Sequence, residues 1–286
     1  MIHLDHLLHP VRSAKSAQRK IRQRIQKAIA QRQLHMIRRG QVDRCWCDGE
    51  LLPFKWHASY GVCANCGCHV NRRPPLDLKE LYSCDFYWRF MQETHGYPPI
   101  EARAELYKND GRLAYWLQLI ARYAAPQGTV IEVGCAPGVL LAELQTKGYK
   151  CIGVEPSPDT AHWVQTQMHV NVQAGLFPGM ELPQCDVFMA FDVLEHSPRP
   201  VEFLQEVARL LNPGGFAIIQ TPIERYGYEP PFGEAFGSAF KEYEHLFLFN
   251  NKAMEKLAAR AGLEIIESKE RLWLHHEICV LRKIGT

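Results

Sequence analysis

The stretch from Thr129 to Pro158 constrains the fold more than any other part of the chain. It runs from an apolar, β-branched segment, "TVIEVG", through the turn "CAPG" into a helical pattern, "VLLAELQTKG". A second apolar segment, "KCIGVE", follows and ends on Glu155. Strands buried on both faces have continuous apolar sequences, and helical crossovers join parallel strands. The order therefore predicts an α/β fold built on a doubly wound parallel sheet.

The turn and the glutamate together indicate a nucleoside ligand. Gly134 and Gly138 leave the backbone open, because a bulky side chain at either position would block a ligand. Glu155 stands 21 positions after Gly134, where an acidic residue can accept hydrogen bonds from both ribose hydroxyls. A dinucleotide fingerprint needs three glycines as G-x-G-x-x-G, which Pro137 breaks, so a pyrophosphate is disfavoured. Glu132 would repel a phosphate but can orient an amine, which suits a ligand with an amino-acid moiety.

Five cysteines between residues 45 and 68 form the second informative feature. Two close pairs are separated by 15 residues, about the length of a hairpin that brings two turns together around a tetrahedral zinc. Four thiolates would fill the coordination shell, so such a zinc would be structural. Ordinary free thiols are the alternative. The predicted ligands are Cys45, Cys47, Cys63 and Cys66, and because the first pair is unusually tight, Cys68 or His69 could replace one of its members.

The charge of the chain is unevenly distributed. Residues 6–42 hold ten Lys and Arg and no acidic residue, whereas the rest carries 23 basic and 31 acidic residues, although the net charge is +2. Apolar residues recur in this arm at near-helical spacing, which predicts a basic amphipathic helix. Such a helix packs on the body or on a second subunit of an oligomer, or contacts an anionic partner such as nucleic acid or a membrane surface.

No apolar run reaches the roughly 18 to 20 residues that a membrane span needs, and the N-terminus lacks the apolar core of a signal peptide. A soluble, cytoplasmic protein is therefore expected. We predict a basic, helical arm (1–42), a zinc-binding module (43–75), a helical connector that covers the ligand site (76–125) and the α/β domain (126–286). The aromatic residues of a predicted lid are Tyr226, Tyr228, Phe232, Phe236, Phe240 and Tyr243. A deep, covered site favours a small molecule or a chain end over a nucleic-acid duplex.

Five successive motifs resemble those of class I S-adenosylmethionine-dependent methyltransferases, in the group that includes quinone-biosynthesis and sugar methyltransferases. They are "VIEVGCAPG", Glu155, "CDVFMAFDVLEH", "LLNPGGFAIIQTP" and "EHLFLFNNKAMEKLAARAGLEIIE", and they cover about residues 126–286. The resemblance implies a seven-stranded, mostly parallel sheet that binds S-adenosylmethionine. The cysteine window followed by "NRRPP" resembles the zinc-ribbon-like N-terminal module of some natural-product and polysaccharide methyltransferases. The glycine turn departs from the family, since Ala136 and Pro137 stand where many members have a polar residue before a glycine.

The resemblance also implies roles for individual residues. Gly134 and Gly138 would let the backbone approach the methionine part of the cofactor, Glu132 would help to hold its amino group, and Glu155 would bind the ribose. Most members carry an acidic residue near the adenine after the third strand, but here backbone contacts and packing by Leu176 would serve. The expected cofactor-binding set is Glu132, Gly134, Cys135, Gly138, Glu155, Pro156, Gly175, Leu176, Phe191 and Asp192.

Methyl transfer requires an aligned acceptor and, for a neutral hydroxyl, a general base. His196 and His245 are the candidate bases, because both are expected at the mouth of the site, whereas the domain's other histidines are assigned to surface helices or to the far strand. His245 is slightly favoured, since a residue beside a lid can be withdrawn and returned. Asp192 ends the fourth strand where the methyl group should point, and its alternative role is a helix cap. A further alternative is a divalent ion held by Asp192, Glu195 and His196.

The favoured function is therefore methyl transfer from S-adenosylmethionine to a small-molecule or glycan acceptor, most simply to oxygen. Carbon methylation of a sugar nucleotide is a variant of this function. Two alternatives belong to other classes: an RNA methyltransferase that uses the basic arm, which the acidic body disfavours, and a non-catalytic zinc-containing interaction protein.

Overall fold

The computed structural model describes residues 37–82, 97–124, 127–222, 239–271 and 276–285, together with Ile21, Ile25 and Ala28. Most of the predicted basic arm and most of the predicted lid lie outside these residues. Within the arm, Ile21, Ile25 and Ala28 are helical, whereas residues 37–42 are not, and the side chains of Ile21 and Ile25 are exposed. Among the helices that the structure describes, none is long and apolar enough to cross a membrane.

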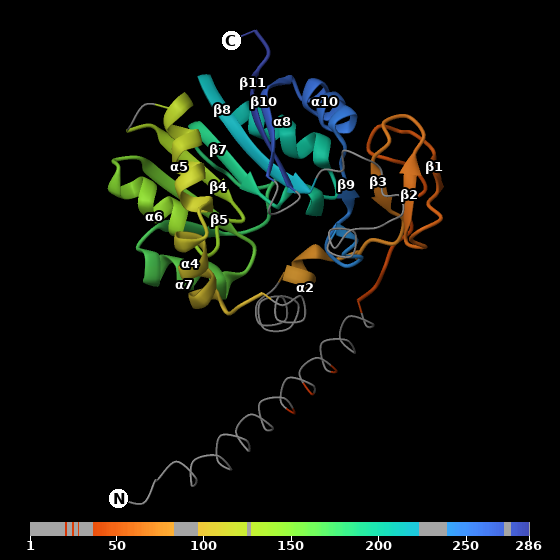
Figure 1. Ribbon diagram of the computed structural model, residues 1–286, viewed down its shortest axis with the longest axis horizontal. Helices are drawn as coiled ribbons and strands as arrows, with labels where there is room; N and C mark the ends of the chain where they lie inside the picture. Colours follow the sequence, from red (N-terminus) through yellow and green to blue (C-terminus); the bar gives the residue numbers. More distant parts are fainter. Residues whose placement is uncertain are drawn as a thin grey trace, which may run out of the picture.

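A seven-stranded sheet forms the centre of the molecule (Figure 1). Its strand order is β10-β11-β8-β7-β4-β5-β6. Strands β4 to β8 run parallel to one another. Strand β11 pairs antiparallel with β8, and β10 pairs antiparallel with β11. The predicted doubly wound, mostly parallel sheet is confirmed. The strands are β4 (Thr129–Val133), β5 (Lys150–Glu155), β6 (Asn171–Ala174), β7 (Cys185–Phe191), β8 (Leu211–Pro222), β10 (Leu263–Arg271) and β11 (His276–Lys283).

Helices cover both faces of this sheet (Figure 1). Strand β4 is buried on both faces, which explains its unbroken apolar sequence. One core packs between the sheet and the helices α5 (Arg112–Tyr123), α6 (Val139–Thr146) and α7 (Pro158–Met168). The other core packs between the sheet and the helices α8 (Pro200–Leu210) and α10 (Asn251–Arg260).

Two further helices belong to the predicted connector, α2 (Leu78–Tyr82) and α4 (Ile100–Asn109), and α5 completes it. Helix α5 has a strongly amphipathic sequence that buries Trp116, Leu119 and Ile120 against the sheet. A short 3₁₀ helix, η3 (Leu194–His196), follows β7. These elements bring the connector to the carboxyl edge of the sheet, where ligands bind in open α/β folds.

The cysteine-rich residues form a second, smaller antiparallel sheet with the order β1-β2-β3-β9. Three of its strands lie in the predicted module: β1 (Leu51–Pro53), β2 (Tyr60–Cys63) and β3 (His69–Asn71). The fourth, β9 (Phe247–Leu248), comes from the α/β segment and pairs with β3 (Figure 1). The small sheet therefore combines three strands of the predicted zinc-binding module (43–75) with one strand of the predicted α/β domain (126–286).

Candidate functional site

A cavity of about 710 Å³ opens at the carboxyl edge of the large sheet. The residues that follow β4, β5 and β7 line it, together with residues of α2, α4 and the segment before β9. Strand β4 lies between β5 and β7, so the chain crosses to opposite sides of β4 at this point. This reversal of strand order is where doubly wound sheets place their ligands. The volume is within the range of small-molecule sites.

The cavity brings together most of the residues predicted from the sequence. Three members of the expected cofactor set do not line it: Glu132, Cys135 and Gly138. Both predicted bases, His196 and His245, are in the lining. The remaining members of the cofactor set are also in the lining: Gly134, Glu155, Pro156, Gly175, Leu176, Phe191 and Asp192.

Gly134 and Gly138 are required in the turn for different structural reasons. Gly134 lines the cavity at φ +69°, and a Cβ there would meet Val193 Cγ2 at 2.6 Å. Gly138 adopts φ +82° at the N-cap of α6, and a Cβ there would run into the side chain of Val164 on α7. The expectation that Gly138 faces a ligand is therefore not met, because its missing side chain makes room for helix packing.

Two buried carboxylates lie near the turn. Glu155 is 5% exposed at the end of β5, lines the cavity, and accepts a 3.3 Å hydrogen bond from the Ser157 N–H. Glu132 is equally buried, and its Oε2 has no hydrogen-bond partner among the described residues. Burial raises the pKa of Glu132 well above its ordinary value. Of the two carboxylates, Glu155 lines the cavity and Glu132 does not.

Asp192, which follows β7, is positioned by side chains of β8 and β11. Its carboxylate accepts hydrogen bonds of 3.1 Å from Gln220 Nε2 and lies 2.8 Å from His276 Nδ1. Burial alone would raise the pKa of Asp192, but the charge and hydrogen bond of His276 outweigh it and lower the pKa to about 2. The N-cap of η3 is Val193, with no side-chain cap hydrogen bond. The alternative role of Asp192 as a helix cap is therefore wrong.

The two predicted bases lie side by side. The ring centroids of His196 and His245 are 5.0 Å apart. His196 Nδ1 is 2.8 Å from the carbonyl oxygen of Glu244, and His245 Nδ1 is 2.6 Å from that of Ala239. A carbonyl only accepts, so Nδ1 carries the proton in both rings and Nε2 keeps its lone pair.

Burial also keeps both imidazoles neutral. It lowers the pKa of His245 well below its ordinary value, and the nearby His196 lowers it further. Burial likewise lowers the pKa of His196, which the charge of Glu244 offsets in part. His245 is 4% exposed and fixed through its ring and backbone. The expectation that it is withdrawn beside a lid is not supported, because its neighbours hold it in place.

Glu195 lies beneath the two rings and is fully buried. Its Oε2 accepts a 3.0 Å hydrogen bond from Thr221 Oγ1, and its Oε1 lies 3.8 Å from His196 Nε2. Burial and the charge of Asp192 raise its pKa well above the ordinary value. One ligand-type atom from each of Glu195, His196 and His245 lies within 4.8 Å of the others. Asp192, predicted for an ion site with Glu195 and His196, is not in this group.

Several residues that line the cavity were not predicted from the sequence. His276 was assigned to the far strand, but β11 pairs with β8 and places it opposite Pro222, at the cavity. No local pattern reveals this, because the position depends on the register between two strands. Helix α4 contributes Arg103, whose guanidinium lies 4.8 Å from the ring centroid of Tyr97. The missed residues of the lining include Tyr82, Tyr97, Arg103, Lys241 and His276.

Two of the predicted lid aromatics lie within the described residues, and neither lines the cavity. Phe240 stacks on Phe54 and His57 of the cysteine-rich region. The Arg39 guanidinium lies 5.0 Å from the ring centroid of Tyr243. Both rings therefore pack against the N-terminal part of the chain, and the other four predicted lid residues lie outside the described residues.

The four predicted metal ligands come together at one end of the small sheet. The sulfurs of Cys45 and Cys66 are 3.7 Å apart, and those of Cys47 and Cys63 are 3.5 Å apart. All four lie within 4.8 Å of one another. Four sulfurs at 2.3 Å from a tetrahedral zinc are about 3.8 Å apart, so the arrangement fits this ion. Cys68 lies outside the group, and its thiol faces the carbonyl oxygen of Leu248 at 3.3 Å.

The fold is that of the class I S-adenosylmethionine-dependent methyltransferases. The chain belongs to the methyltransferase domain family, whose model matches residues 106–268. An uncharacterized methyltransferase of Mycobacterium avium is 32% identical over 112 residues, which cover 37% of this chain and 42% of that protein. A second, from Mycobacterium tuberculosis, is 31% identical over the same length. The chain thus matches less than half of the length of these relatives.

Two solved structures share the fold at low sequence identity. The complex between the Haloferax volcanii Trm112 methyltransferase activator and a putative methyltransferase matches with a TM-score of 0.52 and 15% identity, over 64% of this chain and 94% of that chain. The mitomycin 7-O-methyltransferase MmcR matches with a TM-score of 0.50 and 17% identity, over 60% of this chain and 53% of that chain. At this identity the likeness concerns the fold alone.

Proposed function

We propose that this protein transfers a methyl group from S-adenosylmethionine to the hydroxyl of a small-molecule or glycan acceptor. One observation carries the proposal: a single cavity is lined both by Glu155 and the turn at Gly134 and by the His196–His245 pair. The first set of residues suits a nucleoside with an amino-acid moiety, and the second suits a hydroxyl that must lose its proton.

The cofactor would be held by the edge of the large sheet. Glu155 would accept the ribose hydroxyls, and the backbone at Gly134, which lines the cavity, would approach the methionine part. Phe191, stacked on Trp116 with ring centroids 4.2 Å apart, would form an apolar wall. When bound, the cofactor supplies an electrophilic methyl group on a sulfonium. The chain's own residues then have to align the acceptor and exclude water.

The general base in this proposal is His245, with His196 as its neighbour and alternative. The Nδ1 proton of His245 is held by the Ala239 carbonyl, so its Nε2 can accept the acceptor's hydroxyl proton as the new bond to oxygen forms. The hydroxyl proton would move to Nε2 of the histidine as the methyl group's bond to sulfur breaks, so that a methyl ether, an imidazolium and a neutral thioether would account for all atoms and charges.

The test uses S-adenosylmethionine labelled in its methyl group and a fractionated extract of the host. We expect label in low-molecular-weight or glycan fractions and none in RNA. Label in RNA would favour the nucleic-acid alternative, and label in a sugar nucleotide that is not released by cleavage of methyl ethers with hydriodic acid would indicate carbon methylation. Absence of transfer to every fraction, with the cofactor bound, would contradict catalysis and favour a binding protein.

We also propose that Cys45, Cys47, Cys63 and Cys66 hold one structural zinc. The sulfur separations support this assignment, and four thiolates leave no open coordination position for chemistry. The zinc would stabilise the small sheet and take no part in methyl transfer. Metal analysis of protein purified without added zinc tests the proposal, with one equivalent per chain as the expected result.

A further inference from the structure

One segment of the chain belongs to both sheets. Residues 239–249 contribute Lys241, Glu244 and His245 to the cavity lining and then continue directly into β9 of the small sheet. The backbone N–H of Leu246 donates to the Glu195 carbonyl at 2.8 Å, and its own carbonyl accepts from the Asn71 N–H at 2.9 Å. Leu246, the residue after His245, is thus hydrogen-bonded both to Glu195 of the cavity lining and to Asn71 of the cysteine-rich region.

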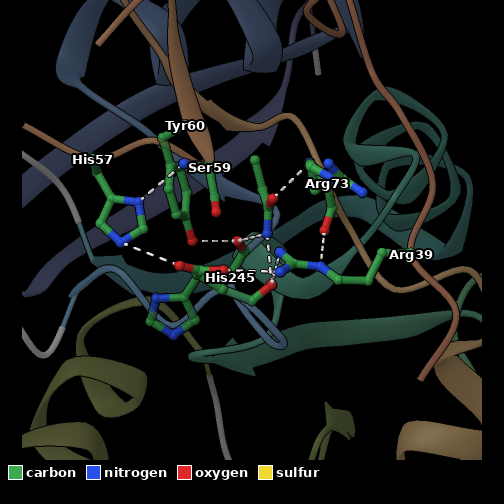
Figure 2. Close-up of polar contacts among 8 residues, drawn as sticks. Arg39, His57, Ser59, Tyr60, Arg73 and His245 are labelled. Atoms are coloured by element: carbon green, nitrogen blue, oxygen red, sulfur yellow. Dashed lines mark hydrogen bonds and ion pairs between the residues drawn. The ribbon is translucent and has the colours of Figure 1, made fainter. Parts of the chain in front are cut away.

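Two buried side chains of the cysteine-rich region hold the backbone of this segment (Figure 2). Tyr60 Oη donates to the carbonyl oxygen of His245 at 2.8 Å. Asn71 Nδ2 donates to the Glu242 carbonyl at 2.7 Å, while its Oδ1 accepts from the Arg73 N–H. Tyr60 and Asn71 are each 1% exposed. Buried hydrogen bonds of this kind fix a backbone, because a lost donor leaves a carbonyl without a partner and away from water.

Charged groups add a second set of contacts nearer the surface. Arg39 Nη1 lies 2.8 Å from Glu242 Oε2, and His57 Nε2 lies 3.6 Å from the other oxygen of the same carboxylate. Figure 2 shows Arg39, His57 and Tyr60 around the loop that carries His245. Four side chains of the N-terminal part, those of Arg39, His57, Tyr60 and Asn71, therefore contact one short loop.

The apolar cores are continuous across the same boundary. Cys66 and Val70 of the small sheet belong to one buried cluster with Phe249 and Met254, which lead into and form α10. The cysteine-rich region is thus not a separately packed unit, because its core merges with the core between the large sheet and α10. A change in the structure of the cysteine-rich region is therefore expected to shift the packing next to the cavity through this shared core.

We propose that the cysteine-rich region, residues 43–75, supports the loop that brings His245 to the methyl-transfer site, and that Tyr60 and Asn71 are positioning residues that set the place of His245. The inference rests on the proposed function for the role of the site. It predicts that the bound metal stabilises not only the small sheet but also the geometry of the general base. Two hydrogen bonds and one β-pairing carry this dependence.

The experiment compares Tyr60→Phe and Asn71→Asp with the parent protein. Phe keeps the ring of Tyr60 but removes the donor, and Asp keeps the acceptor toward Arg73 but removes both amide hydrogens. The first measurement is amide hydrogen exchange over residues 239–249, together with exchange of the His245 C2 proton. We expect both to be at least about threefold faster in each variant. Exchange over residues 129–155 and affinity for S-adenosylhomocysteine should stay within about twofold.

Tyr149→Phe is the matched control, since Tyr149 is also buried and its Oη donates to a carbonyl, that of Ala124, far from the small sheet. It should leave exchange at residues 239–249 unchanged. If exchange at these residues and at His245 is the same in Tyr60→Phe, Asn71→Asp and the parent, the positioning role is wrong. The same conclusion follows if exchange rises equally over the whole domain, because that is a general loss of stability.

The second measurement is methyl transfer to whichever extract fraction the parent protein labels. The variants should lose at least about fivefold in kcat, with the affinity for the cofactor kept, because a base displaced by a fraction of an ångström aligns poorly. An unchanged kcat would overturn the inference. If the parent labels no fraction, the proposed function fails, and the exchange measurements still decide whether Tyr60 and Asn71 position His245.

Discussion

His196 and His245 face each other across 5.0 Å, and each directs Nδ1 at a backbone carbonyl, that of Glu244 for the first and that of Ala239 for the second. The two rings come from different elements, η3 after β7 and the segment before β9. Their arrangement leaves two unprotonated Nε2 atoms in one cavity, which is the state that a general base needs.

Replacement of either histidine should lower catalysis without loss of the cofactor. We expect His245→Ala to lower kcat by at least about tenfold, since general bases contribute roughly 10² to 10⁴ in rate. Affinity for S-adenosylhomocysteine should stay within about threefold. His162→Ala, an exposed histidine on α7, is the control and should be neutral. Near-normal kcat in both His245→Ala and His196→Ala would mean that the acceptor is already ionised when it binds.

The pH profile should report the lowered pKa of the base. Burial holds the pKa of His245 well below its ordinary value, so the ring stays neutral in mildly acidic solution. The acidic limb of kcat/KM should therefore lie below about pH 6.5, the ordinary value for histidine. A limb at or above that value would show that the buried imidazole does not control the rate.

Stability should depend on pH through the same two rings. The unfolded chain binds protons at His196 and His245 near pH 6.5, whereas the folded pKa values are depressed. The free energy of unfolding contributed by these groups is complete above the unfolded pKa and is lost as the pH falls toward the folded pKa. We expect His245→Gln to show a smaller loss between pH 7.5 and 5.5 than the parent, measured by urea unfolding. Identical pH dependence in the two proteins would contradict this.

Zinc content separates the proposed ligands from their neighbours. Cys63→Ser should lose most of the metal, because a structural zinc site needs all four thiolates. Cys68→Ser should keep one equivalent, since the hydroxyl can still donate to the Leu248 carbonyl and Cys68 lies outside the group of four. Elemental analysis of the two variants decides between these ligand sets. Loss of zinc in Cys68→Ser with retention in Cys63→Ser would reverse the assignment.

Two glycines at the ends of α6 offer a test of packing. Both have positive φ, +82° at Gly138 and +90° at Gly148. An alanine in this conformation costs about 1 kcal/mol at either site. Gly138→Ala also drives a Cβ into Val164, whereas no atom lies within 4 Å at Gly148. Urea unfolding should show that Gly138→Ala loses about 1 to 3 kcal/mol more of the free energy of unfolding than Gly148→Ala does. Equal losses in the two variants would mean that α7 moves aside to accommodate the new methyl group.

The sequence predicted the centre of the fold because the signals there are local. Strand β4, the glycine turn, α6 and β5 follow one another without interruption, and Glu155 ends β5 at the cavity. Burial on both faces forces apolar residues into these strands, and a turn of this kind needs glycine. The grouping of Cys45, Cys47, Cys63 and Cys66 was predictable for the same reason, since their spacing is short.

The parts of the site that sequence did not reveal depend on contacts between distant segments. His276 reaches Asp192 only through the register of β11 against β8. Phe247 pairs with Val70 through a strand of two residues, which is too short for any pattern to show. The sequence correctly indicated that position 138 requires glycine, but it could not show that the group next to this glycine is the side chain of Val164 and not a ligand.

Calorimetric titration of the protein with S-adenosylmethionine tests the central claim most directly. We expect one binding site per chain, no competition by NAD, and a loss of roughly 1 to 3 kcal/mol of binding free energy in Glu155→Ala, the cost of leaving buried polar groups unpaired. Glu143→Ala, which removes a partly exposed carboxylate of α6 that pairs with Lys147 at 3.1 Å, should bind as the parent does. Unchanged affinity in Glu155→Ala, or tighter binding of NAD than of S-adenosylmethionine, would contradict the assignment of this cavity.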